Sequence, residues 1–180
     1  MWSRKLFYLI LLIGLVGINI NLMAQKEAKE QEWKSIHILY TTRSEVEKRF
    51  GEPTKGREFK FQSLYEQKDY NLLVYYTQGC TSNEDVDNYN VPPDTVKYLI
   101  VYLKKPISLS AFNIDITKID TTKFEKTVSP QVRYLTDIDE NVIYRLSGND
   151  ETSVISIDYR PKKEDYYRLA CSKQIKQNCN

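Results

Sequence analysis

The hydrophobic pattern changes after Pro53, and this change constrains the fold more than any other feature of the sequence. Before it, apolar residues recur with the helical period of about 3.6 residues, and after it short apolar runs follow the strand period of about 2. Polar segments that contain Gly, Pro, Asn or Asp separate these runs. We expect strands in residues 58–65, 71–77, 95–103, 133–136, 142–147 and 153–159, with the last three as a meander.

One helix precedes these strands. Residues 41–53 read TTRSEVEKRFGEP, in which Thr42 and Glu45 form a capping box. Gly51 suits the C-cap position, and Pro53 prevents the helix from continuing. We therefore predict the fold class α+β, with this N-terminal helix packed on an antiparallel β-sheet in a single domain.

The segments between and after the strands have weaker patterns. Lys104–Pro106 is expected to end a strand, and Ser108–Ile116 to form a short extended piece. Ile119–Val128 has mixed periodicity and is interpreted as a loop or a short helical turn. Lys162–Ser172 is expected to form a short closing helix.

The first 24 residues have the layout of a secretory signal peptide. Arg4 and Lys5 precede an apolar run from Leu6 to Ile18, and Ala24 is a small residue before a charged segment. The apolar run is shorter than the roughly 20 residues that a spanning helix needs. We expect cleavage after Ala24, with an uncleaved membrane anchor as the alternative. The predicted organisation is a signal peptide (1–24), a linker (25–32), the α+β domain (33–171) and a polar tail (172–180).

The charges of the chain argue against a nucleic-acid partner. The whole sequence has 26 Lys and Arg and 24 Asp and Glu, a formal net charge of +2. Arg4 and Lys5 supply this excess, so the chain without its first 24 residues has 24 of each sign and is neutral. A neutral domain offers no general attraction to a polyphosphate backbone.

Three cysteines lie in the part that would be exported, where disulfides form and persist. They are Cys80, Cys171 and Cys179. We favour a Cys80–Cys171 bridge, because each of these residues ends a structured segment while Cys179 lies in the polar tail. The pairs Cys80–Cys179 and Cys171–Cys179 remain alternatives.

Few residues in the sequence suggest catalysis or metal binding. His37 is the only histidine, so histidine-dependent triads and multi-histidine zinc sites would all require it. The loop NEDVDNYN contains Glu84, Asp85 and Asp87, a weak calcium candidate that lacks the EF-hand glycine and terminal Glu. A solvated acidic loop is the simpler interpretation of these residues. No cofactor is expected.

Tyrosine is unusually frequent, with 14 residues. Tyrosine favours strands and half-buried surfaces, and it is also enriched where proteins contact their partners. Several tyrosines fall on the expected strands, so a tyrosine-lined sheet face could form a recognition surface. The expected contact residues are Tyr75, Tyr98, Tyr102, Tyr144 and, in the loop of residues 81–94, Tyr89.

The helix segment resembles a known family. Thr42, Val46, Phe50, Gly51 and Pro53 stand where the BamE-like (SmpA/OmlA) lipoproteins and the β-lactamase-inhibitor-protein-like modules have their helix-end motif. The resemblance covers about 13 residues closely and the rest of the chain loosely. It implies an exported bacterial domain with a helix on an antiparallel sheet and a binding role. The lipid-attachment cysteine of those lipoproteins is missing after Ala24.

Together these observations predict a non-enzymatic binding module that is exported to the periplasm or the cell exterior. Its expected partner is a protein or another envelope component. Two alternatives stay open. One is a hydrolase that acts through carboxylates or Cys80, and the other is an envelope structural protein tethered by an uncleaved N-terminal segment. Membrane contact is expected only in this last case.

Overall fold

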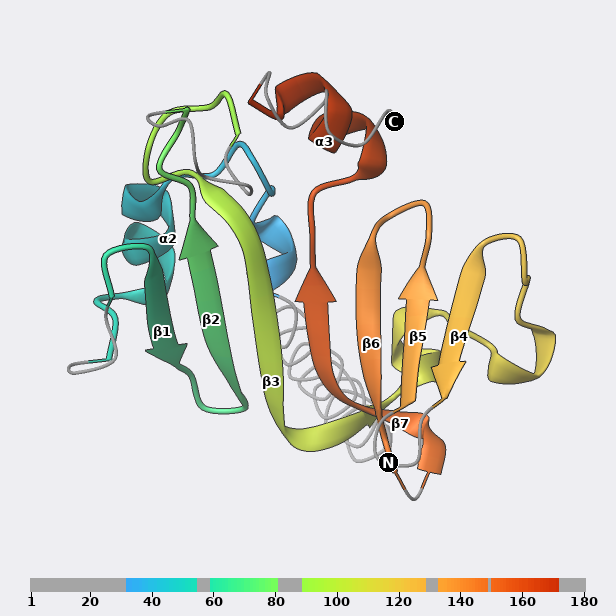
Figure 1. Ribbon diagram of the computed structural model, residues 1–180. Coiled ribbons are helices and arrows are strands. Elements are labelled where there is room, and N and C mark those ends of the chain that lie inside the picture. The colour runs from blue at the N-terminus through green and yellow to red at the C-terminus, as the bar shows by residue number, and fades with distance from the viewer. Residues whose placement is uncertain (1–31, 55–58, 81–88, 129–132, 149, 172–180) are drawn as a thin grey trace, which may run out of the picture. The chain divides into compact units, whose positions relative to one another are not determined.

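A computed structural model describes residues 32–54, 59–80, 89–128, 133–148 and 150–171. The chain divides into two compact units, Met1–Ser35 and Ile36–Asn180. The described part of the first unit is one 3-10 turn, η1 (Glu32–Ser35). All other described elements belong to the second unit (Figure 1).

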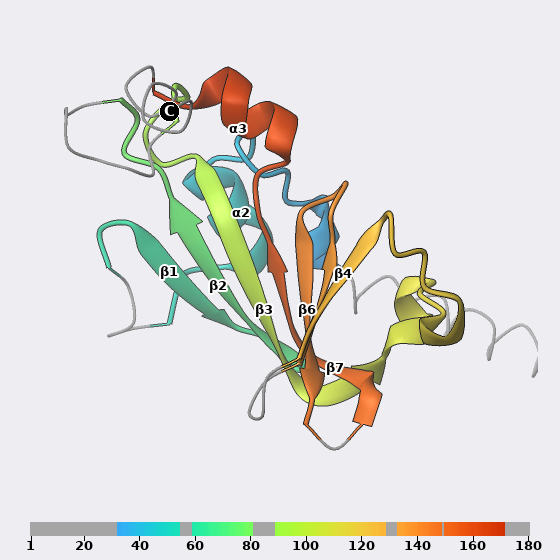
Figure 2. The same cartoon turned by 45° about the vertical axis from the view of Figure 1, so that its right-hand side comes forward.

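The second unit is built around one antiparallel sheet of seven strands in the order β1-β2-β3-β7-β6-β5-β4 (Figures 1 and 2). The strands are β1 (Gln62–Glu66), β2 (Tyr70–Tyr76), β3 (Val96–Ser108), β4 (Phe124–Val128), β5 (Arg133–Asp137), β6 (Val142–Ser147) and β7 (Asp150–Tyr159). The remaining elements are the helices α2 (Arg43–Phe50) and α3 (Lys163–Leu169) and the 3-10 turns η2 (Leu109–Phe112) and η3 (Ile116–Lys118).

Two meanders make up this sheet, and one strand pair joins them. The first meander is β1-β2-β3, after which the chain crosses through η2 and η3 to the far edge of the sheet. The second meander returns from β4 through β5 and β6 to β7, which pairs with β3. In this pairing Leu99 lies opposite Tyr159 and Val101 opposite Ile157. Because β1 and β4 do not pair, the sheet is open.

The predicted α+β class is wrong, because the described chain is mainly β. The helices α2 and α3 have only eight and seven residues. Ile119–Val128 contains β4, whose sequence FEKTV lacks apolar alternation because four of its five residues are exposed at the sheet edge. The region Ser108–Ile116, expected to be extended, instead contains the turn η2 and the start of η3.

Strand β3 also runs farther than the sequence predicted. It continues through Pro106 to Ser108, although Lys104–Pro106 was expected to end it. Proline has no N–H for the ladder and is tolerated where pairing is irregular. The register of β3 against β7 shifts between Tyr102 and Ile107, so Pro106 lies within this irregular stretch.

Helix α2 forms within the range that the sequence predicted. The backbone N–H of Thr42 donates to Glu45 Oε2 at 2.7 Å, which confirms the capping box. Gly51 has a φ of +83°, a value that favours glycine, and its N–H donates to the Glu47 carbonyl at 2.9 Å. Phe50 is buried, with its ring centroid 6.2 Å from that of Tyr65 on β1.

Arg43, the first residue of α2, holds the helix to the sheet. Its guanidinium carbon lies 4.1 Å from the centroid of the buried Tyr76 ring. Its nitrogens make polar contacts with the Lys60 carbonyl at 2.8 Å, Ser63 Oγ at 3.1 Å and Asp94 Oδ1 at 3.1 Å. One side chain therefore links α2 to β1, to β2 and to the segment that leads into β3.

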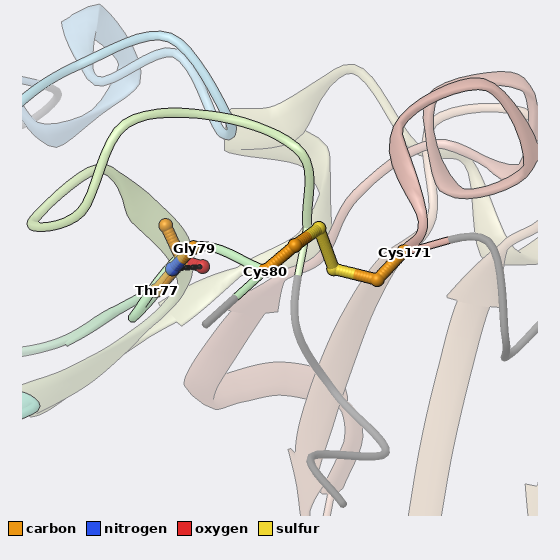
Figure 3. Close-up of a disulfide and its surroundings, with 4 residues drawn as sticks. All are labelled: Thr77, Gly79, Cys80 and Cys171. Carbon is orange, nitrogen blue, oxygen red and sulfur yellow. Dashed lines mark hydrogen bonds between the residues drawn. A yellow bond between two sulfur atoms is a disulfide. The ribbon is translucent and has the colours of Figure 1, made fainter. Parts of the chain in front are cut away.

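The predicted Cys80–Cys171 disulfide is confirmed (Figure 3). It connects the segment after β2 to the residues after α3, with a Cα–Cα distance of 5.8 Å and a sequence separation of 91. Beside it, the Gly79 N–H donates to Thr77 Oγ1 at 3.0 Å. Gly79 has a φ of +72°, and a Cβ there would lie 3.3 Å from the Val91 carbonyl oxygen, so both the backbone conformation and the space favour glycine in this turn. Cys179 lies outside the described residues.

Removing this bridge is expected to destabilise the fold strongly. The double substitution Cys80→Ser and Cys171→Ser should lower the free energy of unfolding by about 4–5 kcal/mol, because the bridge restricts a long loop in the unfolded chain. Urea unfolding under oxidising conditions measures this difference. A Cys179→Ser control should match the wild type and lose stability on reduction as the wild type does. Equal stability of the double variant and the wild type would contradict the prediction.

Candidate functional site

The two faces of the sheet differ in burial, as strand β2 shows. Tyr70, Leu72, Val74 and Tyr76 alternate along it and are all buried, whereas the residues between them are half-buried. The half-buried residues of β2 lie on the second face of the sheet, which we call the tyrosine face. The pairing registers identify the residues of the other strands that lie on the same face. Its residues include Leu73, Tyr75, Tyr98, Ile100, Tyr102, Asp158, Ile143, Arg145, Tyr134 and Thr136.

Three of the five tyrosines expected as contact residues share this face. Tyr75 and Tyr98 lie opposite each other on β2 and β3, and their rings stack with centroids 4.1 Å apart at 18°. Tyr102 lies on the same face of β3 with 41% of its surface exposed. Burial of part of its ring raises the pKa of Tyr102. The structure therefore gathers these three aromatic side chains into one surface.

The other two expected tyrosines lie elsewhere. Tyr144 is buried on the opposite face of the sheet, where its ring centroid lies 5.5 Å from that of Phe112. Tyr89 is buried in the loop before β3, and its bridge partner is Ala170, just after α3. Its ring meets Tyr166 of α3 edge-on at 6.1 Å. Tyr144 is thus separate from the tyrosine face, and Tyr89 belongs to the surroundings of α3.

A cavity of about 560 Å³ lies between α3 and one end of the tyrosine face, and we call it the α3 groove. Figure 1 shows α3 beyond the end of β7, on the side where β5 ends and β6 begins. The strand ends form the floor and α3 forms a wall. The lining residues are Tyr89, Lys97, Tyr98, Glu125, Thr136, Ile138, Asn141, Arg160, Pro161, Lys163, Tyr166 and Tyr167.

Helix α3 is held at both ends, so this wall has a fixed position. At its start, Asn141 Nδ2 donates to the Pro161 carbonyl at 2.6 Å, and Lys162 pairs with Glu140 at 2.7 Å. At its other end, the Asn90 N–H donates to the Leu169 carbonyl at 2.6 Å. The disulfide follows directly after this end.

A polar cluster holds the outer side of α3. Arg168 Nη2 donates to Asp165 Oδ1 at 2.6 Å and to Tyr40 Oη at 2.5 Å. Tyr40 belongs to the turn before α2 and is 128 residues from Arg168 in the sequence. This cluster therefore joins two segments that are distant along the chain. These contacts leave the side chains of Tyr166 and Tyr167 to line the groove.

The groove combines aromatic rings with an excess of positive charge. Among the described residues of its lining, Lys97, Arg160 and Lys163 are the cations and Glu125 is the single acid. Lys97 Nζ lies 5.8 Å from the Tyr98 ring centroid, and Arg160 Nη2 lies 3.8 Å from Asp158 Oδ2. Such a lining can hold a ligand that has both an apolar body and a negative group.

Sequence reasoning found Tyr98 and Tyr89 but missed most of this groove. The missed residues include Lys97, Arg160 and Lys163, together with the adjacent pair of rings on α3. The signal that was available is the local sequence RPKKEDYY, where basic and aromatic residues follow the end of a strand. It gave no indication of which distant strands would lie beneath it.

The other candidates for chemistry find no support in the described residues. His37 is exposed in the turn before α2. Glu84, Asp85 and Asp87, the weak calcium candidate, lie outside the described residues. Among the described residues, no group of three or more His, Cys, Asp or Glu could hold a metal ion. Cys80 is bonded to Cys171 and therefore has no thiol in this state. None of the described helices is both long enough and apolar enough to cross a membrane.

Asp158 is a partly buried carboxylate on the tyrosine face. It lies on β7 opposite Ile100 of β3 and Ile143 of β6, and 24% of its side chain is exposed. Burial raises the pKa of Asp158, although the positive charges of Arg160 and Arg145 act in the opposite direction. The folded protein therefore binds a proton at Asp158 more tightly than the unfolded chain does.

This shift predicts a pH dependence of stability. The advantage of protonating Asp158 is fully present below the unfolded-state pKa, near the ordinary 3.8, and is lost as the pH rises through the higher folded-state value. Urea unfolding between about pH 3 and about pH 7 should therefore show the wild type losing stability relative to Asp158→Asn. Asp139→Asn, in an exposed turn, is the control and should run parallel to the wild type. Parallel curves for Asp158→Asn would show the prediction to be wrong.

Comparisons of the chain with protein-family models, with curated proteins and with solved structures find no match. They neither support nor contradict the resemblance to the BamE-like lipoproteins.

Proposed function

We propose that the protein is a non-enzymatic binding module whose partner occupies the α3 groove and the adjoining part of the tyrosine face. The observation that carries the proposal is the groove itself, a cavity of about 560 Å³ lined by tyrosines and a few charged groups. Sites for ligands have volumes of roughly 300–1,000 Å³ and combine apolar walls with a small number of polar groups. A partner protein or another envelope component is the proposed occupant.

The rigidity of the walls supports this proposal. A preformed site loses less conformational entropy on binding than a site that must be ordered by its ligand. Both ends of α3 are held, and the floor consists of paired strands. The stacked pair Tyr75 and Tyr98 extends the aromatic surface from the groove along the sheet.

The features that would favour a hydrolase are missing from the described groove. A carboxylate mechanism needs two acids at a defined separation, and the described lining contains only Glu125. A cysteine mechanism would need a free thiol, and Cys80 is in a disulfide. These observations favour binding over hydrolysis as the proposed role.

We further propose that the protein is exported and that its first 24 residues are removed. The disulfide is compatible with an oxidising compartment such as the periplasm or the cell exterior. The basic and apolar start of the sequence has the order of a signal peptide.

Mass spectrometry of the protein purified from its natural cells tests this export proposal. The expected N-terminus is Gln25, with two hydrogens fewer than the fully reduced chain because of the bridge. An intact N-terminus in the membrane fraction would instead favour the tethered structural protein.

The groove proposal predicts where ligands bind. In NMR spectra of the purified, isotope-labelled protein, a mixed set of aromatic acids, amides and amines should shift the signals of groove residues such as Lys97, Thr136 and Tyr166. Thr136→Trp should suppress these shifts by filling the floor of the groove. Thr127→Trp, an exposed position on β4 outside the lining, is the matched control and should preserve them. Shifts that are absent, or that cluster on another surface, would contradict the proposal.

A further inference from the structure

We propose that the ligand of the α3 groove is an acidic peptide segment of a partner protein. This inference rests on the proposed binding function and specifies the chemistry of its partner. It is carried by the mismatch between the charge of the groove and the charge of the chain. The chain as a whole has 26 cationic and 24 acidic side chains, whereas the described residues of the groove lining include three cations and one acid.

Two of these cations are available to a ligand. Among the described residues, neither Lys97 nor Lys163 has a carboxylate partner within salt-bridge distance, and Lys163 is exposed. Arg160 approaches Asp158 only at 3.8 Å, the outer limit of an ion pair. Since these three side chains enter the groove from β3, from the end of β7 and from α3, carboxylates inside it would meet positive charge from both floor and wall.

The aromatic lining suits the rest of a peptide. Tyr98, Tyr166 and Tyr167 supply broad rings that can pack on apolar side chains and still hydrogen-bond through their hydroxyls. Tyrosine and arginine are enriched in protein interfaces for this reason. The stacked Tyr75 lies next to Tyr98 along the sheet, so a chain longer than the groove would continue to find aromatic contacts.

The neutral polar groups of the groove are less suited to an uncharged sugar. Asn141 is the only side-chain amide in the described lining, and its Nδ2 already donates to the Pro161 carbonyl. The described groove therefore offers charged donors in place of the neutral amides that could pair with sugar hydroxyls. The combination of tyrosine and arginine, which is enriched in protein interfaces, favours a peptide, and the test below distinguishes a peptide from an acidic polysaccharide.

Fluorescence anisotropy with labelled synthetic peptides tests this inference on the purified protein. The probes are three short peptides in which Tyr alternates with Glu, Ser or Lys. We expect the Glu–Tyr peptide to bind at least about tenfold more tightly than the Ser–Tyr peptide, and this preference to shrink as salt is added. The Lys–Tyr peptide should bind most weakly.

Matched variants assign the preference to the groove. The double substitution Lys97→Gln and Lys163→Gln should weaken binding of the Glu–Tyr peptide by about tenfold, since two charge contacts are lost. The control replaces Lys68 and Lys105 by Gln, two exposed lysines outside the lining, and should change the affinity less than about twofold. Glu125→Gln should strengthen binding by removing the acid of the lining. Circular dichroism verifies that each variant is folded.

Several outcomes would overturn the inference. These are equal affinity for all three peptides, an unchanged affinity in the Lys97 and Lys163 double variant, or tight binding of polygalacturonate with none of the Glu–Tyr peptide. If neutral aromatic amides still shift the groove signals in NMR, the proposed binding function survives while the acidic-peptide inference fails. If no probe of any charge enters the groove, the proposed function itself fails.

Discussion

The pairing of β3 with β7 is the constraint on which the rest of the structure depends. It connects two meanders that would otherwise be separate small sheets, and neither a three-stranded nor a four-stranded sheet alone would have this groove. The register that places Val101 opposite Ile157 also places Tyr98 on the same face as Asp158, through the alternation of side chains. Because β7 leads directly into Pro161 and α3, the position of the groove wall follows from this pairing as well.

Around this sheet, two kinds of contact hold the helices. Arg43 holds α2 through one guanidinium that meets a ring, a hydroxyl, a backbone carbonyl and a carboxylate. Helix α3 has a covalent attachment instead, supported by hydrogen bonds at each end. The difference fits their burial, since α2 has two buried apolar residues and α3 has none. A helix without a buried apolar face needs other attachments to stay docked.

The sequence predicted the features that depend on neighbouring residues. The capping box of Thr42 and Glu45, the strand expected at residues 71–77 and the disulfide partner of Cys80 were all predicted correctly. The fold class was wrong because α2 and α3 have only eight and seven residues, whereas the polar edge strand β4 and the continuation of β3 past a proline add to the sheet. Period-two alternation does not indicate which face of β6 is buried. Tyr144 was therefore expected to be a contact residue together with Tyr98, although it lies on the buried face. The groove depends on strand order, which local patterns do not contain.

The docking of α3 has a consequence for how the molecule assembles. Its attachments reach Cys80, Asn90, Asn141 and Tyr40, which are distributed over the second unit, so α3 can dock only after the sheet has formed. A helix of seven residues is too short to persist in water without such support. The proposed binding site is therefore complete only once α3 has docked, and formation of the Cys80–Cys171 disulfide is part of its assembly.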